Sequence, residues 1–189
     1  NAGTYDDSEG VVLRYEFKAD IAAYLATRTG ADVPRSLKAL IDFNTRHADA
    51  EMPWFGQELF EQSEAKGPLT DKAYLSALAR NRRLSRGEGI DAALRANRLD
   101  AMIAPTGGPA WMTDLVVGDH FTGGYSTASA VAGYPHITVP AGFVHGLPVG
   151  ISFFAGAWAE PALLAIAYAF EQVTLARRPP RYLEHAPIA

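Results

Sequence analysis

One segment, residues 126–155 (STASAVAGYPHITVPAGFVHGLPVGISFFA), constrains the fold more than any other part of the chain. It opens with small residues that predict a short helix, and Gly133 gives that helix a place to end. Tyr134-Pro135 then favours extended backbone, because a proline disfavours the helical conformation in the residue before it. Residues 136–139 alternate apolar and polar side chains, which indicates a β-strand.

A second strand at residues 149–154 follows after turn residues that include Pro140, Gly142 and the run Gly146-Leu147-Pro148. Its side chains are almost all apolar, which is typical of a strand covered on both faces. The segment therefore predicts a hairpin whose second strand lies inside a layered sheet.

Hydrophobic periodicity places the other elements. Residues 11–17 alternate, with Val11, Leu13, Tyr15 and Phe17 on one face, so we expect a strand there. Residues 99–104 indicate another. We expect helices at residues 18–29, from about residue 34, at 56–66, at 70–97 with a bend at 87–89, and from residue 160. Together these patterns predict an α/β fold with a mixed β-sheet.

Composition narrows the class of protein. The chain has 189 residues, 48% of them hydrophobic and 20% charged, which suits one globular domain. A net charge of -4 argues against a nucleic-acid partner, and the sequence contains no apolar run long enough to predict a membrane span or a secretory leader. We expect no membrane partner; the compartment stays unknown, with the cytoplasm only a default.

Metal or nucleophile motifs are not evident. The 5 histidines lack the spacing of zinc ligands and there is no cysteine, so we expect no metal site. Ser126 follows Gly123-Gly124 as a nucleophile could, but the nucleophile-elbow pattern fails because residue 128 is alanine. A helix cap is the favoured interpretation of Ser126.

The sequence between residues 106 and 122 is glycine-rich and irregular, and a loop of that length in a compact domain is usually functional or poorly ordered. It carries Trp111, Asp114, Asp119, His120 and Phe121. The two aspartates could face one pocket or could only be solvated loop residues. Tryptophan is often largely buried, so packing in the core is an equal alternative for Trp111.

Three motifs, AVAGYPHITVPAG, GLPVGISFF and EPALLAIAYAFE, resemble the C-terminal portion of amidase signature enzymes. These serine amide hydrolases include bacterial peptide amidases and the A subunit of glutamyl-tRNA amidotransferase. The resemblance is strong over residues 99–174, and YEFKADIAAYL and MPWFGQELFEQSEA are closer to the peptide amidase branch. It implies part of a three-layer α/β/α sandwich, no cofactor, and a small-molecule or peptide amide as substrate.

The family's catalytic lysine, cis-serine and nucleophilic serine belong to motifs that this sequence lacks. The resemblance therefore implies that residues 1–189 are the C-terminal portion of an amidase domain, that the N-terminal half is missing, and that no residue here is catalytic. We expect residues 1–9 to be disordered or left by tag cleavage, and residues 177–189 to form an irregular tail.

Asp119-His120-Phe121-Thr122 is similar to an Asp-x-Phe-Thr segment of the amidotransferase subunit, whose aspartate holds the amino group of the substrate. By this resemblance Asp119 binds substrate. Phe121, Thr122, Trp111 and Thr106 would form the rim of the same pocket.

Two alternatives to an amidase portion remain open: a non-catalytic binding module with an amidase-like fold, and an amidotransferase-type subunit that needs partner chains. We also expect self-association, because a sheet without its other half exposes a strand edge or an apolar face. The residues expected to line that surface are Val149, Ile151, Phe153 and Phe154, with Leu13, Tyr15 and Phe17.

Overall fold

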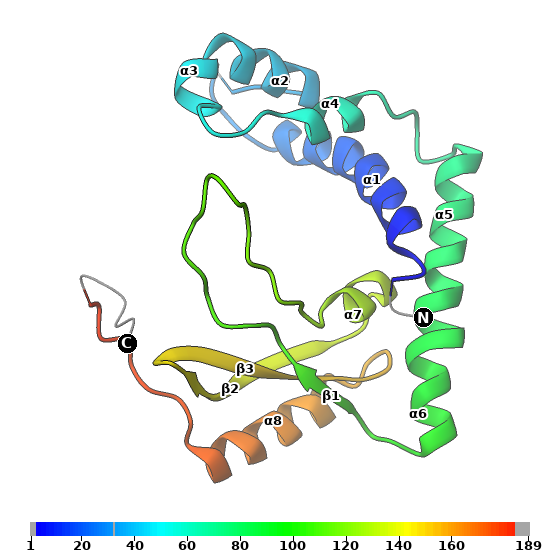
Figure 1. Ribbon diagram of the computed structural model, residues 1–189. Coiled ribbons are helices and arrows are strands. Elements are labelled where there is room, and N and C mark those ends of the chain that lie inside the picture. The colour runs from blue at the N-terminus through cyan, green and yellow to red at the C-terminus, as the bar shows by residue number, and fades with distance from the viewer. Residues whose placement is uncertain (1–2, 32, 184–189) are drawn as a thin grey trace. The chain divides into compact units, whose positions relative to one another are not determined.

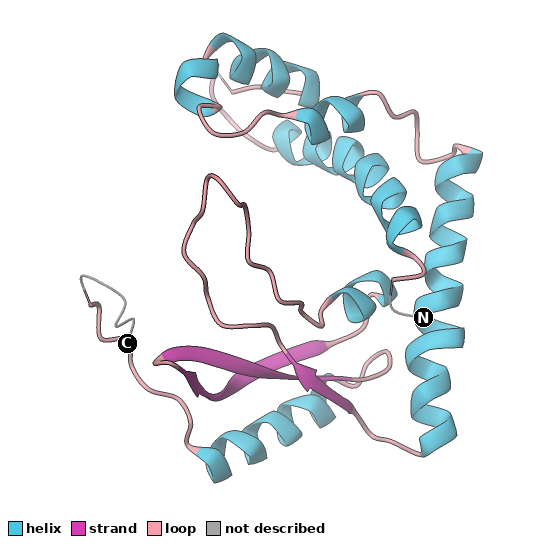
Figure 2. Cartoon of the chain, in the orientation of Figure 1, coloured by secondary structure: helices cyan, strands magenta, loops and turns pink. Residues whose placement is uncertain are grey.

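The computed structural model describes residues 3–31 and 33–183, and it divides into two compact units (Figure 1). The helical unit is Gly3–Asn81, and the sheet unit begins at Arg82. Figure 2 shows that the described strands all belong to the sheet unit.

The helical unit contains α1 (Asp6–Ala26), α2 (Leu37–Arg46), α3 (Ala48–Glu51), α4 (Glu58–Glu64) and all but the last residue of α5 (Lys72–Arg82). Acidic side chains in the first turn of α1 suit the positive end of the helix dipole. The prediction of a disordered start at residues 1–9 is therefore wrong from Asp6 onward, while residues 1–2 lie outside the described residues.

The strand predicted at residues 11–17 is wrong, because this segment is part of α1. The buried positions Ser8, Val12 and Tyr15 recur at helical spacing, whereas Leu13 is 58% exposed. Val12 and Tyr15 pack with Tyr74 and Ala77 of α5. Tertiary packing on this helical stripe, rather than the short apolar alternation, decides the structure.

Ser36 explains where α2 begins. Its hydroxyl accepts a hydrogen bond from the backbone N–H of Ala39 at 3.1 Å, which satisfies one of the free donors of the first turn. The expected helix is therefore present, but it starts at Leu37 rather than beside Pro34.

The long helix predicted over residues 70–97 is divided as expected, into α5, the π-helical η1 (Arg83–Ile90) and α6 (Asp91–Asn97). Gly89 has non-helical angles, φ −113° and ψ −111°. A Cβ atom there would lie 2.5 Å from the carbonyl oxygen of Leu84, so this backbone path requires glycine. The bend predicted at residues 87–89 is confirmed.

The described strands form an antiparallel sheet in the order β1-β3-β2, from β1 (Met102–Pro105), β2 (His136–Val144) and β3 (Leu147–Phe154). The hairpin and the central position of its second strand are confirmed. The α/β class is confirmed as well, and every strand pair within the described residues is antiparallel rather than mixed.

Helices cover both faces of this sheet, which gives three layers. On one face, Phe153 packs against Leu163 and Ala167 of α8 (Glu160–Thr174). On the other, Phe154 packs against Ile90 of η1 and Ala132 of α7 (Thr127–Ala132). Successive residues of β3 thus point to opposite layers, as the period of a strand requires.

The surface predicted for self-association is corrected by this arrangement. The central strand β3 has a neighbour on each side, and Phe153 and Phe154 are 6% and 1% exposed. Tyr15 is buried as well. Within the described residues, the open edges of the sheet belong to β1 and β2.

The tail has no helix or strand at residues 177–183, and the rest of the predicted irregular tail lies outside the described residues. Among the described helices, none has the length and hydropathy that a membrane span requires.

Candidate functional site

The loop between β1 and α7 is closed at its base. The backbone N–H of Tyr125 donates to the carbonyl oxygen of Thr106 at 3.2 Å, and Gly107 and Gly124 form an isolated antiparallel bridge. The chain therefore leaves the end of β1 and returns to the same point before α7, as Figure 1 shows. All five residues that the sequence proposed for substrate binding belong to this loop or its base.

An open hollow of about 360 Å³ lies at the base of the loop. It is lined by Pro105, Gly107, Gly108, Thr122, Gly123, Gly124 and Tyr125. A Cβ atom on Gly108 would collide with the hydroxyl oxygen of Thr122. Glycine at position 108 therefore lets the Thr122 hydroxyl lie close against the backbone at this hollow.

Three of the proposed binding residues lie together farther along the loop. The indole Nε1 of Trp111 donates to Asp119 Oδ1 at 3.4 Å, and the rings of Trp111 and Phe121 meet edge-on at 6.2 Å. Trp111 is 41% exposed and Phe121 is 69% exposed. Packing in the core is therefore wrong for Trp111, which lies on an accessible part of the loop.

Asp114 serves the loop itself. Its Oδ1 accepts the backbone N–H groups of Val116 and Val117 at 2.9 and 2.8 Å, and its Oδ2 lies 3.6 Å from Nε2 of His120. Hydrogen bonds from the Val117 and Val116 backbone, and then from His120, lower the pKa of Asp114. Of the two aspartates, Asp114 forms the turn and Asp119 accepts the hydrogen bond from Trp111.

Thr106 points onto the sheet. Its Oγ1 lies 2.5 Å from Oγ1 of Thr138 in β2 and 2.8 Å from Oγ of Ser152 in β3. We call these three side chains the hydroxyl cluster. Ser152 is fully buried, Thr106 is half-buried and Thr138 is exposed, so the cluster runs from the interior of the sheet to its surface.

Aromatic rings lie on the same face of the sheet as Ser152 of the hydroxyl cluster. Phe154 follows Ser152 by two residues and so shares its face of β3. Its ring lies 5.0 Å from that of Tyr125 and 6.0 Å from that of His136. Burial lowers the pKa of His136, which favours the neutral imidazole, and no hydrogen-bond partner reaches its Nε2 among the described residues. This face thus combines a few polar groups with aromatic walls, as binding sites do.

Thr138, Ser152 and His136 are not among the site residues that the sequence predicts. A signal was available, because Thr138 and Ser152 interrupt apolar strands of one hairpin at positions that turn out to be paired in register. Ser126 does stand directly before α7, but its side chain makes no capping hydrogen bond. No cluster of three metal-ligating side chains occurs within the described part of the chain.

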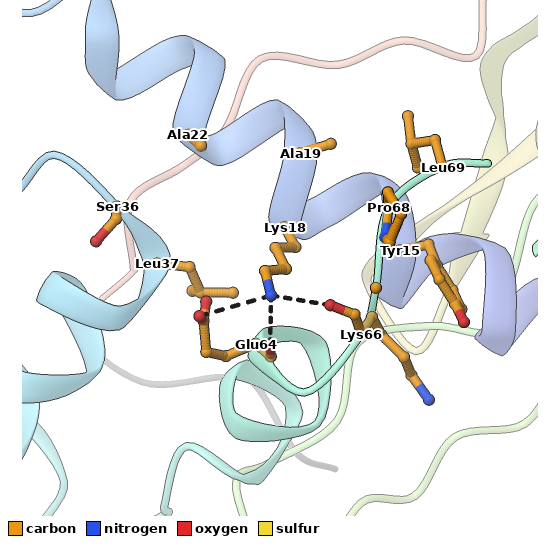
Figure 3. A pocket seen from close by; sticks show the side chains of 11 residues that line it. Tyr15, Lys18, Ala19, Ala22, Ser36, Leu37, Glu64, Lys66, Pro68 and Leu69 are labelled. Atoms are coloured by element: carbon orange, nitrogen blue, oxygen red, sulfur yellow. Dashed lines mark hydrogen bonds and ion pairs between the residues drawn. The ribbon is translucent and has the colours of Figure 1, made fainter. Parts of the chain in front are cut away.

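The helical unit has a crevice of about 450 Å³, shown in Figure 3. Lys18 lies in it and donates to the carbonyl oxygens of Glu64 and Lys66 at 2.5 and 2.8 Å, with the Glu64 carboxylate at 3.6 Å. These contacts occupy the ammonium group in joining α1 to the end of α4. The wall of the crevice is otherwise largely apolar, including Ala19, Ala22, Leu37, Pro68 and Leu69.

The fold and site define an α/β protein whose candidate binding groups lie on a sheet face and on the loop beside it. No family model matches the sequence. A probable amidase of Arabidopsis thaliana is 38% identical over 183 residues, which are 96% of this chain and 32% of that protein. The native peptide amidase of Stenotrophomonas maltophilia superposes with a TM-score of 0.86 and 46% identity, covering 100% of this chain and 37% of that structure.

A peptide amidase in complex with the competitive inhibitor chymostatin is also similar, with 49% identity and a TM-score of 0.89 over 96% of this chain and 37% of that structure. The chain belongs to the amidase signature family. It spans about a third of the length of these relatives, since the matches cover 32% and 37% of them.

Proposed function

We propose that this chain is the C-terminal portion of an amidase that cleaves carboxamide or peptide-amide C–N bonds through a serine acyl-enzyme. The observation that carries the proposal is the 46% identity to the Stenotrophomonas maltophilia peptide amidase over 100% of the chain. That relative is named for peptide amide hydrolysis, and both the sheet and the helical unit fall within the match.

In this proposal the catalytic serine, cis-serine and lysine come from the rest of the longer protein. The chain supplies scaffold and one wall of the substrate pocket. An exposed aromatic pair, Trp111 and Phe121, would remove water from an apolar group of the substrate. Asp119 would hold a free amino group, and Thr122 and Thr106 would line the base of the loop.

The test is ammonia release from N-acetyl-phenylalaninamide by the longer protein that carries this chain. The proposal predicts steady turnover and a burst of the first product when acyl transfer is faster than deacylation. A matched control is the same protein with Trp158→Phe, which changes an 88% exposed tryptophan outside the proposed pocket. Absence of turnover on carboxamides of any side chain, with the fold intact, would favour the non-catalytic module.

We also propose that the chain by itself self-associates, now through different residues from those first expected. The loop exposes Leu115, Val116 and Val117 at 70%, 94% and 75%, and the sheet has open edges at β1 and β2. Exposed strand edges and apolar patches both recruit other chains. Light scattering across a dilution series should show a mass that rises with concentration, and Val116→Lys should reduce it.

A further inference from the structure

We propose that Thr138 contacts the substrate directly: its hydroxyl oxygen accepts a hydrogen bond from the N–H of the carboxamide to be cleaved. The inference rests on the proposed amidase function and adds a specificity-determining residue to the site. It follows from counting the hydrogens of the hydroxyl cluster.

Each of the three hydroxyl groups has one hydrogen to donate. Thr138 Oγ1 donates to the carbonyl oxygen of Ile151 at 3.3 Å, since a carbonyl can only accept. All of these bonds form together only if Thr106 donates the bond of 2.5 Å to Thr138. The bond of 2.8 Å between Thr106 and Ser152 must in turn be donated by Ser152.

The hydrogens therefore run in one direction, from Ser152 to Thr106 to Thr138 to the Ile151 carbonyl. Every hydrogen of the cluster is used, and only oxygen lone pairs remain for a ligand. Ser152 is fully buried, and Thr138 is the exposed end of the chain of hydroxyls. The cluster thus presents one accessible oxygen that can accept a hydrogen bond and has no hydrogen left to give.

Gly150 makes this arrangement possible. Thr106 extends β1 and Thr138 lies in β2, on opposite sides of the central strand, yet their hydroxyl oxygens meet across it. A Cβ atom on Gly150 would lie 2.8 Å from Thr138 Oγ1 and 2.9 Å from Thr106 Oγ1. Any side chain at this position would push the two hydroxyls apart, so the missing side chain lets the cluster form.

An acceptor without a hydrogen discriminates among ligands. A carboxamide has two N–H donors at one end and a carbonyl oxygen at the other, so its nitrogen end complements Thr138. An ester has no donor on its leaving group and gains nothing there. The rings of Phe154, Tyr125 and His136 lie on the same side of the sheet and would exclude water from this contact, which strengthens it.

The experiment compares two substrates, N-acetyl-phenylalaninamide and N-acetyl-phenylalanine methyl ester, in the longer protein. Thr138→Val keeps the shape of the side chain but removes the acceptor. We expect KM for the amide to rise about 5-fold to 10-fold, as for the loss of one hydrogen bond, with kcat and the ester kinetics nearly unchanged. Thr138→Ser should restore the amide KM, and Gly150→Ala should reproduce the effect of valine.

Thr174→Val is the matched control, because Thr174 also donates its hydroxyl to a backbone carbonyl, that of Phe170 at 2.9 Å, but lies in α8. It should leave both substrates unaffected. Equal changes for amide and ester in Thr138→Val, or no change for either, would overturn the inference while leaving amidase function intact. A wild-type protein that cleaves no amide would instead overturn the proposed function, and this inference with it.

Discussion

The two units differ in how fully their polar side chains are satisfied: among the described residues, the buried side-chain atoms without a hydrogen-bond partner, Ser129 Oγ and His136 Nε2, belong to the sheet unit. In the helical unit, polar groups hold segments of the chain together: Lys18 meets two carbonyl oxygens and a carboxylate, and Arg35 donates to the carbonyl oxygens of Leu25, Arg28 and Gly30. In the sheet unit, Thr138 is exposed, and the buried Nε2 atom of His136 has no hydrogen-bond partner among the described residues.

This difference teaches where a ligand would gain binding energy. A group that is already satisfied within the protein must lose its partners before it can bind, whereas a positioned acceptor beside aromatic rings needs no such rearrangement. The crevice around Lys18 is larger than the hollow beside Thr122, about 450 Å³ against about 360 Å³. The volume of a cavity is therefore a poorer guide to function here than whether its polar groups already have hydrogen-bond partners within the protein.

The largest expected effect is the loss of all amide hydrolysis when this chain is tested without the rest of the longer protein. The purified chain of 189 residues should release no ammonia from a peptide amide, because serine without an activating base is a weak nucleophile. Assays of ammonia release from a peptide amide, and of arylamine release from an aryl amide, at high protein concentration check this expectation. Turnover that disappears in Ser126→Ala would contradict it and would place a catalytic site in the sheet unit.

The next prediction tests whether Asp119, in the loop of the sheet unit, contributes to substrate binding. In the longer protein, Asp119→Asn should weaken binding of substrates with a free amino group by about 1–3 kcal/mol, the range for a charge-assisted hydrogen bond. Substrates without that amine should be little changed. Steady-state KM values for phenylalaninamide and its N-acetyl derivative provide the measurement, and an equal effect on both would return Asp119 to a solvated loop residue.

Lys18 should matter for stability and not for binding. Lys18→Ala leaves the carbonyl oxygens of Glu64 and Lys66 without this donor, and we expect a loss of about 1–2 kcal/mol in the free energy of unfolding, since the side chain is partly exposed. Lys38→Ala is the control, because it removes only an exposed i,i+4 pair with Asp42 and should cost less than about 0.5 kcal/mol. Urea unfolding of both variants measures the difference. A larger loss in the control would be contrary to this account.

The smallest expected effect concerns pH. Because backbone N–H groups lower the pKa of Asp114, its contribution to the loop is present above the ordinary pKa of 3.8 and is lost as pH falls through the lower folded value. The Val116 and Val117 amide signals in NMR spectra should therefore titrate with a midpoint below 3.8. Asp114→Asn should abolish that titration. A midpoint at or above the ordinary value would show that the turn does not form.

Parts of this molecule could be predicted from sequence because local chemistry decides them. Pro135 and the apolar run at residues 149–154 locate the hairpin, and Gly89 marks the bend in the long helix. Residues 11–17 could not be assigned in this way, since a seven-residue alternation fits a strand while only contacts with α5 reveal the helical stripe. The secondary structure of so short a segment is decided by the residues that pack against it in the fold.

The candidate site likewise has one part that could be predicted from local sequence and one part that depends on the fold. Its loop residues stand close together in sequence, from Trp111 to Thr122, and could be recognised by resemblance. The hydroxyl cluster joins residues 32 and 46 positions apart, so it emerges only when β1, β2 and β3 are aligned. The role of Gly150 could not be predicted from sequence, because it depends on the space that this glycine leaves for the side chains of Thr106 and Thr138.

Methyl NMR of the longer protein tests the central claim most directly, namely that the sheet unit and not the helical crevice meets the substrate. Threonine and alanine methyl groups provide probes in both places: Thr106, Thr122 and Thr138 in the sheet unit, and Ala19 and Ala22 in the crevice. Titration with N-acetyl-phenylalaninamide, in the longer protein with its proposed nucleophilic serine changed to alanine so that the amide is not cleaved, should shift the three threonine signals and leave both alanines unchanged. Saturable shifts at Ala19 and Ala22 with unmoved threonines would contradict the account.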